Sequence, residues 1–467
     1  MSTVQALPGS FRDPSGHVYE VDARIFRTVT DYATTDFDFV CSTGLLQKLT
    51  LNGLVLPFEK VDQGVLGPIG KNAGYVLEAP RIPWISFPYE WPFSSLKAAA
   101  LLHLEIHATA LEHGVTLSDA SAYNVQFYGV RPIFIDHLSF RRYKPGEFWT
   151  GHRQFCEQFL NPLLLRAFLG IPHNAWYRGS QEGIETEDLC RLLKWRNFFS
   201  SNVLSQVLLQ SYFQRSARRN IINLKKEHLP ESRLPLASLQ GLIKKLHRWI
   251  SRLKPLDTGK TIWQNYADFH NYPSKETDLK RQFILDFVRQ TQPKLLWDLG
   301  CNTGTWGIVA LENGAEYVVG FDSDHGALEK TFARSHEGKL LLQPLYMDAA
   351  NPSPNQGWMG RERPSLEARA SADAVLALAF VHHLVIARNI PFIQLLNWIL
   401  DLAPNGVIEF VPKSDSNAQV LLQLREDIFP DYTEECFLSH IAQRAEIIKT
   451  KTLPSSGRIL VWYARRR

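Results

Sequence analysis

The fold of the C-terminal half is decided by residues 295–305, which read LLWDLGCNTGT. An apolar run ends in Asp298, a glycine-rich turn follows, and residues 306–311 continue with a helical pattern. This order predicts a buried strand, a tight loop and a helix N-terminus, the arrangement that binds a nucleotide-like ligand. A second apolar strand, 317–321, ends at Asp322, where a carboxylate can accept hydrogen bonds from both hydroxyls of a ribose.

The spacing of the acid and the glycines distinguishes two classes of ligand. A dinucleotide loop carries Gly-x-Gly-x-x-Gly, whose glycines let a pyrophosphate approach the backbone. Here the order is Asp-x-Gly-x-Asn-x-Gly, formed by Asp298, Gly300, Asn302 and Gly304. A carboxylate beside the loop would repel a pyrophosphate and attract the ammonium of a methionine moiety. A dinucleotide site and a turn without a ligand remain as alternatives.

This order of residues resembles motif I of the class I S-adenosylmethionine-dependent methyltransferases, in which Asp-x-Gly-x-(Gly/Asn)-x-Gly is common. The resemblance extends over residues 266–467. It implies S-adenosylmethionine as the cofactor, with the loop at the methionine end and Asp322 at the ribose. It also implies that Asp348, which follows the third expected strand, lies near the adenine amino group.

The remainder of the C-terminal third alternates between strands and helices. The further expected elements are strands at 339–346, 374–380 and 407–411, a helix at 392–402, and an antiparallel pair at 446–450 and 458–464. The continuous apolar run of the fourth strand is typical of a central strand buried on both faces. The pattern predicts an α/β, Rossmann-like, doubly wound and mostly parallel sheet with an antiparallel closing strand, and ligands at the strand C-termini.

Two histidines follow the fourth expected strand, in the run FVHHL at 380–384. In this fold, residues at that strand end face the sulfonium and the acceptor. An oxygen acceptor needs a base for its proton, and imidazole, with an ordinary pKa near 6.5, is suited to that role at neutral pH. We therefore expect His383, or else His382, to be catalytic. The alternative is a histidine that packs on the next helix or bonds to the loop backbone.

Three further residues are candidates for substrate binding. Lys413 and Asp415 follow the fifth strand, where acceptor-binding loops lie, although a turn with a helix N-cap at Asp415 explains them almost as well. Tyr272 belongs to the aromatic segment 263–272. In this family such a segment often folds over the cofactor and excludes water. An ordinary seam between domains is the other interpretation.

The N-terminal half carries a second pattern. Asp119, Asn124 and Asp136 have the spacing of the catalytic loop of protein kinases and small-molecule phosphotransferases, in which the first residue orients the acceptor hydroxyl and the other two hold magnesium. The glycine-rich loop is missing, and the run at 23–27 reads ARIFR in place of Val-Ala-x-Lys. We therefore expect an α+β, kinase-like domain with a degenerate site. The alternative is a region whose polar residues only stabilise turns.

A basic segment connects the two halves. Residues 214–254 hold eleven Lys or Arg and two Glu, a net charge of +9 within a chain whose net charge is +4. Apolar residues recur in it at helical spacing, which predicts an amphipathic basic helix. Such a helix can meet nucleic acid, a membrane surface or an acidic partner. It can equally pack its apolar stripe on a neighbouring domain and leave its cations in water.

These patterns divide the chain into a kinase-like domain (1–175), a basic helical connector (176–260) and a methyltransferase domain (261–467). The combination resembles the methyltransferases related to the nodulation protein NoeA, through DLGCNTG, FVHHL and VPKSD. The resemblance implies methyl transfer to a hydroxylated small molecule or a glycan-type acceptor. Two alternatives stay open: an RNA methyltransferase that uses the basic segment, and a phosphotransferase whose C-terminal half senses S-adenosylmethionine.

Composition excludes several other classes. No stretch of eighteen uncharged apolar residues occurs, and the N-terminus lacks the basic start and apolar core of a signal peptide. We therefore expect a cytoplasmic protein with no transmembrane segment. The five cysteines are scattered, without a Cys-x-x-Cys pair, which argues against a zinc site, an iron–sulfur site or a disulfide framework. No metal is expected.

Overall fold

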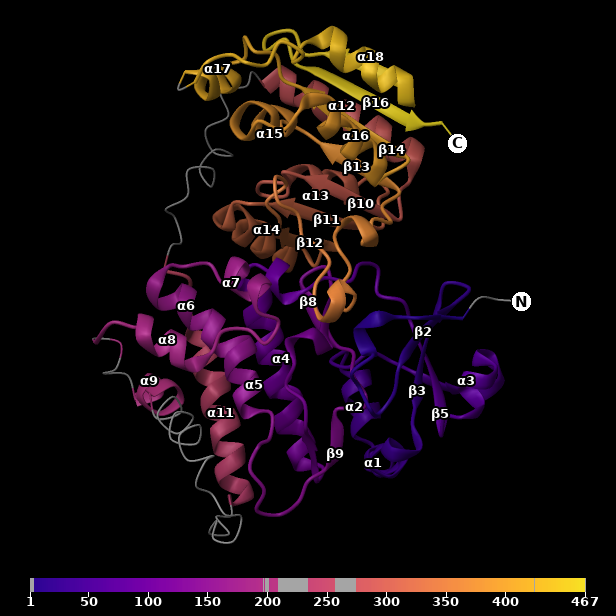
Figure 1. Ribbon diagram of the computed structural model, residues 1–467, viewed down its shortest axis with the longest axis vertical. Coiled ribbons are helices and arrows are strands. Elements are labelled where there is room, and N and C mark those ends of the chain that lie inside the picture. The colour runs from indigo at the N-terminus through magenta and orange to yellow at the C-terminus, as the bar shows by residue number, and fades with distance from the viewer. Residues whose placement is uncertain are drawn as a thin grey trace.

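The computed structural model describes residues 4–195, 197, 201–208, 234–256, 274–423 and 425–466. In Figure 1 the N-terminal half forms the lower part of the molecule and the C-terminal sheet with its helices forms the upper part. The aromatic segment with Tyr272, and the expected boundary at 260, lie outside the described residues. The proposed division into domains therefore stays a prediction.

The C-terminal half is built on a seven-stranded sheet with the order β12-β11-β10-β13-β14-β16-β15. Strands β10 to β14 are parallel to one another, and β16 runs antiparallel to both β14 and β15. The expected Rossmann-like sheet with its antiparallel closing strand is confirmed. Its strands are β10 (Leu295–Leu299), β11 (Tyr317–Asp322), β12 (Leu342–Tyr346), β13 (Ala374–Ala377), β14 (Asn405–Phe410), β15 (Ala445–Thr452) and β16 (Ile459–Arg465).

Helices cover both faces of this sheet (Figure 1). Alternate strand residues face opposite layers, so Leu296 packs in the cluster with α12 while Trp297 packs in the larger cluster that includes α16. All five residues of β10 are buried, as a strand between two helical layers requires. The helices are α12 (Ser274–Thr291), α13 (Thr305–Leu311), α14 (His325–Gly338), α15 (Val381–Arg388), α16 (Phe392–Leu402), α17 (Ser416–Leu422) and α18 (Glu434–Arg444).

Two strands are shorter than the sequence pattern suggested. β12 begins at Leu342 because α14 ends with Lys339 in the left-handed conformation, at φ 50°. β13 ends at Ala377, because the chain turns at Ala379, also left-handed at φ 49°, and enters α15 two residues later. Hydropathy alone does not report such turns, because the residues around them are apolar as well. The early end of β13 brings the histidine pair onto a helix rather than a strand.

The N-terminal half begins with an antiparallel sheet of order β1-β2-β3-β5-β4. Two helices lie between its third and fourth strands in the chain, a long helix follows the fifth strand, and two small two-stranded sheets lie beside the long helix. Its likeness to kinases stays a prediction. The elements are β1 (Gln5–Ala6), β2 (Val18–Val21), β3 (Arg24–Val29), α1 (Asp31–Ser42), α2 (Leu45–Leu51), β4 (Glu59–Val61), β5 (Tyr75–Ala79), α4 (Phe93–Glu112), β6 (Val115–Leu117), β7 (Val125–Tyr128), β8 (Arg131–Phe134) and β9 (Phe140–Arg142).

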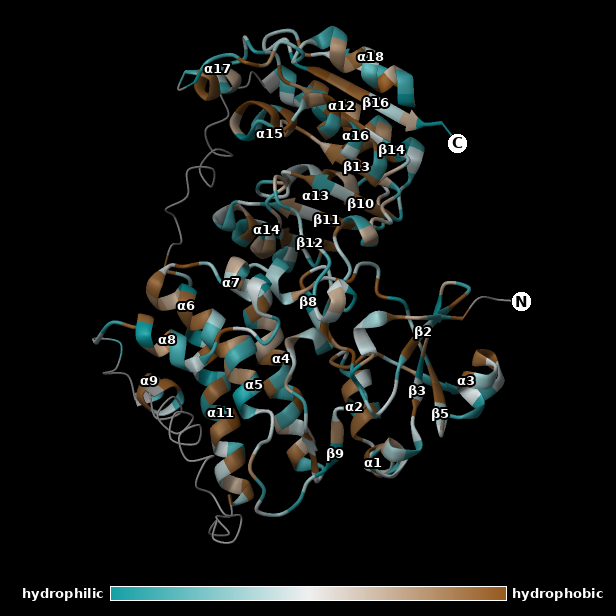
Figure 2. Cartoon of the chain, in the orientation of Figure 1, coloured by the Kyte–Doolittle hydropathy of each residue, from teal (hydrophilic) through white to brown (hydrophobic). Residues whose placement is uncertain are grey.

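The helix α11 (Leu236–Arg252) is the described part of the basic segment, and it packs along α4. Its two faces differ in hydropathy, as the alternating colours along the helix show (Figure 2). The buried stripe consists of Leu239, Ile243, Leu246 and Ile250, and the exposed cations are Lys244, Lys245, Arg248 and Arg252. The apolar face is therefore used for packing within the chain. Every helix in the described ranges is too short or too polar to span a lipid bilayer.

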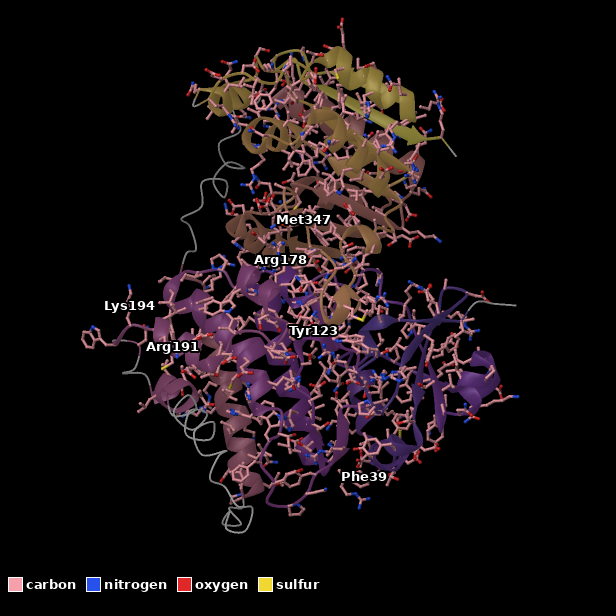
Figure 3. All side chains as sticks on the ribbon, in the orientation of Figure 1. Phe39, Tyr123, Arg178, Arg191, Lys194 and Met347 are labelled. Carbon is pink, nitrogen blue, oxygen red and sulfur yellow. The ribbon has the colours of Figure 1, made fainter. Side chains whose placement is uncertain are left out.

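The two halves are joined by specific polar contacts. The Tyr317 hydroxyl accepts a hydrogen bond from the Gly129 N–H (3.0 Å) and donates to Gln343 Oε1 (2.9 Å). Gln343 in turn donates to the Ser86 hydroxyl (2.9 Å). Figure 3 shows Arg178 and Met347 close to the junction, where the Arg178 guanidinium donates to the carbonyl of Asn351 (2.9 Å). The methyltransferase-like sheet is therefore anchored to the N-terminal half through β11, β12 and the loop that follows β12.

Candidate cofactor and acceptor site

The loop after β10 is held in left-handed backbone conformations. Gly300, Asn302 and Gly304 have φ angles of 71°, 48° and 75°. A Cβ atom at Gly300 would lie 3.1 Å from the Phe380 ring, and one at Gly304 would lie 2.7 Å from Thr331. Glycine meets both demands, and asparagine is among the residues that best tolerate this conformation. A tight turn therefore explains the spacing of the motif. This turn leads directly into the first turn of α13, whose backbone N–H groups are not bonded within the helix.

Asp322, at the end of β11, ties this loop to the neighbouring strand. Its Oδ2 accepts from the Asn302 N–H at 2.7 Å, and its Oδ1 accepts from the Asp324 N–H at 2.8 Å. Burial raises the pKa of Asp322 to about 6. Each carboxylate oxygen has a second lone pair, so the half-buried side chain can still accept hydrogen bonds from a ribose diol.

Asp298 lies behind the loop rather than on the wall of the site. Its side chain is 1% exposed, and burial, with the charge of Asp322, raises its pKa to about 7. The Gly307 N–H donates to it, and among the described residues its Oδ2 has no hydrogen-bond partner. Asp298 therefore stabilises the start of α13. The expected contact between Asp298 and an ammonium group stays a prediction.

A cavity of about 510 Å³ opens at the carboxyl ends of the parallel strands, where doubly wound folds bind ligands. Its lining includes the cofactor-type residues Asn302, Asp322 and Asp348, and also His382 and His383. Gly300 also lines the cavity, whereas Asp298 and Gly304 do not. Four of the six residues expected from the sequence to bind a cofactor thus share one cavity with the two histidines.

Asp348, which follows β12, also lines the cavity. Its Oδ2 is paired with the Arg388 guanidinium at 2.5 Å, and its Oδ1 accepts from the Ala350 N–H at 3.0 Å. Beside it the Tyr346 ring stacks on His325, with centroids 4.7 Å apart and planes 4° apart. Arg388 fixes the orientation of the Asp348 carboxylate, and its expected contact with an adenine stays a prediction.

The two histidines line the cavity from the start of α15. Their ring centroids lie 4.0 Å apart, and His382 is only 1% exposed. Burial, aided by the nearby Arg458, lowers the pKa of His383 to about 4 and that of His382 well below its ordinary value. Both imidazoles are therefore neutral at pH 7. A neutral imidazole has one nitrogen that can accept a proton.

A buried ionic network, which the sequence motifs did not reveal, lines the cavity together with the histidines through Lys280, Glu409 and Arg458. Glu409 Oε2 accepts from Lys280 Nζ at 2.6 Å and from the Ala379 N–H at 2.7 Å. Arg458 pairs with Asp415 through two bonds of 2.8 and 3.0 Å. Burial alone would raise the pKa of Glu409, but Lys280 and Arg458 outweigh it and hold the pKa below its usual value.

The two expected substrate-binding residues after β14 serve the protein itself. Asp415 caps α17 through the Asn417 N–H (2.9 Å), in addition to its pairing with Arg458. Lys413 is paired with Asp427 at 2.7 Å and donates to the Phe429 carbonyl. Neither residue lines the cavity. Their role in substrate binding stays a prediction, and the turn-and-cap interpretation accounts for the observed contacts.

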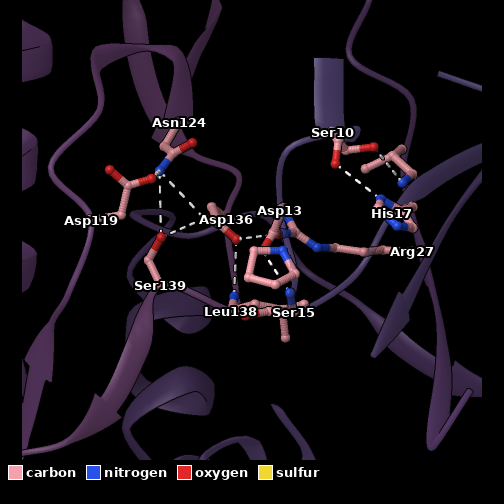
Figure 4. A network of polar contacts seen from close by, with 12 residues as sticks. Ser10, Asp13, Ser15, His17, Arg27, Asp119, Asn124, Asp136, Leu138 and Ser139 are labelled. Carbon is pink, nitrogen blue, oxygen red and sulfur yellow. Dashed lines mark hydrogen bonds and ion pairs between the residues drawn. The ribbon is translucent and has the colours of Figure 1, made fainter. Parts of the chain in front are cut away.

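The three kinase-like residues of the N-terminal half do come together (Figure 4). The Asn124 amide donates to Asp119 Oδ2 (3.0 Å) and to Asp136 Oδ2 (3.3 Å). Arg27 is paired with Asp136 Oδ1 at 2.8 Å. Burial would raise the pKa of Asp136, but Arg27 and the Ser139 hydroxyl outweigh it and lower the pKa. The Asp136 carboxylate is thus already neutralised by Arg27 within the chain. In the described residues no cluster of three His, Cys, Asp or Glu is arranged to hold a metal ion.

The residues of the cavity fit S-adenosylmethionine. Asp322 offers acceptors for two hydroxyls, the loop of Gly300 and Asn302 brings its backbone to the wall, and the buried Asn302 Oδ1 has no partner within the described chain. The strand order, the loop and the cavity together define the class: the C-terminal half is a class I S-adenosylmethionine-dependent methyltransferase, and S-adenosylmethionine is its cofactor.

The chain belongs to the family of the nodulation protein NoeA. It is 44% identical over 460 residues to the NoeA protein of Rhizobium meliloti (strain 1021), an alignment that covers 98% of this chain and 96% of that protein. No family model matches the chain.

Among solved structures, the chain is similar to the magnesium protoporphyrin IX methyltransferase ChlM of Synechocystis PCC 6803 (15% identity, TM-score 0.32, covering 45% of this chain and 96% of that one). It is also similar to the N-methyltransferase NodS of Bradyrhizobium japonicum WM9 (10% identity, TM-score 0.32, covering 43% and 91%). Both were solved with S-adenosylhomocysteine.

Proposed function

We propose that the protein methylates a hydroxyl group of a small molecule or a glycan-type acceptor, and that a neutral histidine, His383 or His382, accepts the hydroxyl proton. The observation that supports this most directly is that Asn302 and Asp322 line the same cavity as both histidines. When bound, S-adenosylmethionine supplies a methyl group activated by a positively charged sulfur. The chain's own residues then hold the reactants, exclude water and receive the proton.

The lowered pKa of the histidines is compatible with this role. A pKa of about 4 makes His383 a weak base toward a free alcohol. However, a hydroxyl oxygen that gains a bond to carbon becomes far more acidic, so a weak base can take its proton late in the step. In this step the oxygen forms a bond to the methyl carbon, the carbon–sulfur bond breaks, and the hydroxyl proton passes to the imidazole. A low pKa also keeps the imidazole unprotonated over the whole neutral range.

Transfer of label tests the proposed function. The full chain is incubated with S-adenosylmethionine tritiated at the methyl group and with a cell extract of the source organism, and the label is followed into small molecules, glycans, lipids and RNA. Asp322→Ala serves as the blank, because it removes the ribose contact. We expect label in hydroxylated small molecules or glycans. Label confined to RNA or to amines would contradict the proposed acceptor.

One observation favours a second activity. Asn124 lies within hydrogen-bonding distance of both Asp119 and Asp136, which brings together the three residues expected of a nucleotide–magnesium site. Arg27 and Ser139 already occupy the Asp136 carboxylate, which argues against transfer of phosphate. Magnesium-dependent binding of ATP, measured by calorimetry and abolished in Asp136→Asn, would support a nucleotide-binding N-terminal half. Unchanged heat in that variant would remove this candidate.

The RNA alternative depends on the basic helix. Its four cations are exposed, but its apolar stripe is packed on α4, and in Figure 1 the helix lies in the lower half of the molecule. RNA binding carried by these cations would weaken steeply with salt. Affinity that is unchanged when all four are replaced by glutamine would exclude it.

A further inference from the structure

Glu276, in the first turn of α12, stands out among the residues that line the cavity. It is 1% exposed, and its Oε1 accepts hydrogen bonds from the Ser455 and Ser456 N–H groups in the turn between β15 and β16. Its other oxygen, Oε2, has no hydrogen-bond partner in the described part of the chain. A buried carboxylate oxygen without a partner is costly, and such an oxygen beside a cavity has its hydrogen-bonding capacity available to a ligand.

The cations at this end of the cavity have already been matched by the chain. Lys280 lies one helical turn from Glu276, and its Nζ is paired with Glu409 Oε2 at 2.6 Å. Arg458 is paired with Asp415 by two hydrogen bonds and with Glu409 at 3.4 Å. Three carboxylates, those of Glu276, Glu409 and Asp415, thus lie near only two cations, Lys280 and Arg458. An anionic acceptor would meet an excess of negative charge here.

The histidines do not change this balance. Both are neutral, and the two ring nitrogens of His382 are buried without a hydrogen-bond partner among the described residues. A neutral imidazole presents one acceptor and one donor. The groups without a partner, Glu276 Oε2 and the His382 ring nitrogens, therefore offer more hydrogen-bond acceptors than donors. This suits a ligand that donates hydrogen bonds.

We propose that Glu276 Oε2 binds the methyl acceptor, and that this acceptor is an uncharged polyhydroxylated molecule in which one hydroxyl donates to Glu276 while another faces the histidines. This inference rests on the proposed function, because it assigns the acceptor of the same reaction. It separates neutral glycans and polyols from phosphorylated sugars, carboxylates and nucleic acids, whose negative charge the site disfavours.

Fractionation of the labelled products tests the class of acceptor. Extract of the source organism is incubated with tritiated S-adenosylmethionine and the full chain, and the aqueous and lipid products are passed over anion- and cation-exchange resins. We expect label in the unretained, neutral fraction. Label retained by either resin would overturn the acceptor class while leaving methyl transfer intact. Absence of label from all fractions, with cofactor binding intact by calorimetry, would overturn the proposed function itself.

The variant Glu276→Gln separates binding from structure. Its amide oxygen can keep the bonds from Ser455 and Ser456, while an amide N–H₂ replaces Oε2 and can no longer accept. We expect an unchanged melting temperature and unchanged cofactor affinity, with the KM of the purified labelled acceptor raised by about 30-fold or more. The matched control is Glu435→Gln, an exposed carboxylate in the first turn of α18, which should leave KM unchanged. A normal acceptor KM in Glu276→Gln would overturn the assignment.

Discussion

Arg369 and Glu90 form a buried ion pair across the two halves of the chain. Arg369 belongs to the loop between β12 and β13, and its guanidinium pairs with Glu90 through two hydrogen bonds. The side chains are only 7% and 3% exposed. The same guanidinium donates to the Ile85 carbonyl at 2.7 Å and lies over the Phe87 ring at 4.5 Å. This pair fixes the loop that follows β12.

Replacement of Arg369 should therefore destabilise the junction strongly. Arg369→Leu leaves the Glu90 carboxylate buried without its partner, and removal of one member of a buried pair costs about 3–5 kcal/mol. Chemical denaturation would measure the loss. The double variant Arg369→Leu with Glu90→Leu should recover much of it, because two apolar side chains often replace a buried pair at little cost. Equal losses in both variants would show that the contact itself is not the cause.

Asp298 predicts an unusual dependence of stability on pH. Its pKa is raised in the folded state to about 7, so folding favours the protonated form, and the stability present at acidic pH is lost as the pH rises toward 7. Asp298→Asn keeps an oxygen for the Gly307 N–H and removes the charge. We expect it to stabilise the cofactor-free protein by roughly 2–4 kcal/mol at pH 8, from 1.36 kcal/mol per pKa unit, and by little at pH 4. A gain that does not vary with pH would contradict this.

Asp322→Ala should weaken the binding of S-adenosylmethionine by one to two orders of magnitude. A hydrogen bond to a charged group contributes roughly 1.5–3 kcal/mol, and the variant also removes the acceptor of the Asn302 N–H. Isothermal calorimetry measures the change directly. Asp427→Ala is the control, since Asp427 is exposed and paired only with Lys413 among the charged residues described. An unchanged affinity would refute the ribose assignment.

Loss of the His383 imidazole should affect turnover rather than cofactor binding. For His383→Ala we expect label transfer to fall about a hundredfold or more, because a positioned base contributes on the order of 10²–10⁴. The affinity for S-adenosylmethionine should stay near normal, since Asp322 and the loop are untouched. His382→Ala, made in parallel, identifies which of the two rings accepts the proton. Unaltered transfer in both variants would remove histidine from the mechanism.

The pH profile of the wild-type protein tests the same assignment without a substitution. Because the pKa of His383 is lowered to about 4, the base is unprotonated above that pH, and transfer should decline only as the pH falls toward 4. With S-adenosylmethionine kept saturating, because the pKa of Asp322 is about 6, rates at pH 5.5 and pH 7.5 should therefore agree within about a factor of two. An acidic limb centred near pH 6.5 would indicate an ordinary, solvated imidazole instead.

Much of the fold of the C-terminal half could be predicted, because the residues that determine its elements are neighbours in the sequence. The apolar strand, the acid and the left-handed glycines of residues 295–305 are contiguous, and the helix at 392–402 was placed at its observed bounds. The contacts of Lys280, Glu409 and Glu276 could not be predicted in this way. Lys280 and Glu409 are 129 residues apart, and Glu276 contacts a turn 179 residues away. No periodicity or motif links such positions, because only the folded sheet brings them together.

The motif residues themselves divide in the same manner. Asp322, Asn302 and both histidines line the cavity, whereas Asp298 lies behind it and Lys413 is paired with Asp427. A motif records the residues that a fold needs, and it does not distinguish those that touch a ligand from those that shape the loop. Burial and hydrogen-bond partners supply that distinction.

The contact of the β7–β8 turn with β12 has a consequence for how the protein can be handled. β12 is the outermost strand of its sheet, and Gly129 lies so close to the segment leading into it that a Cβ atom there would be 2.4 Å from the Leu340 carbonyl. The N-terminal half thereby shields a rim of unpaired backbone groups. If the catalytic half were expressed alone, that rim would be bare to solvent, and aggregation by edge-to-edge pairing would be its expected failure.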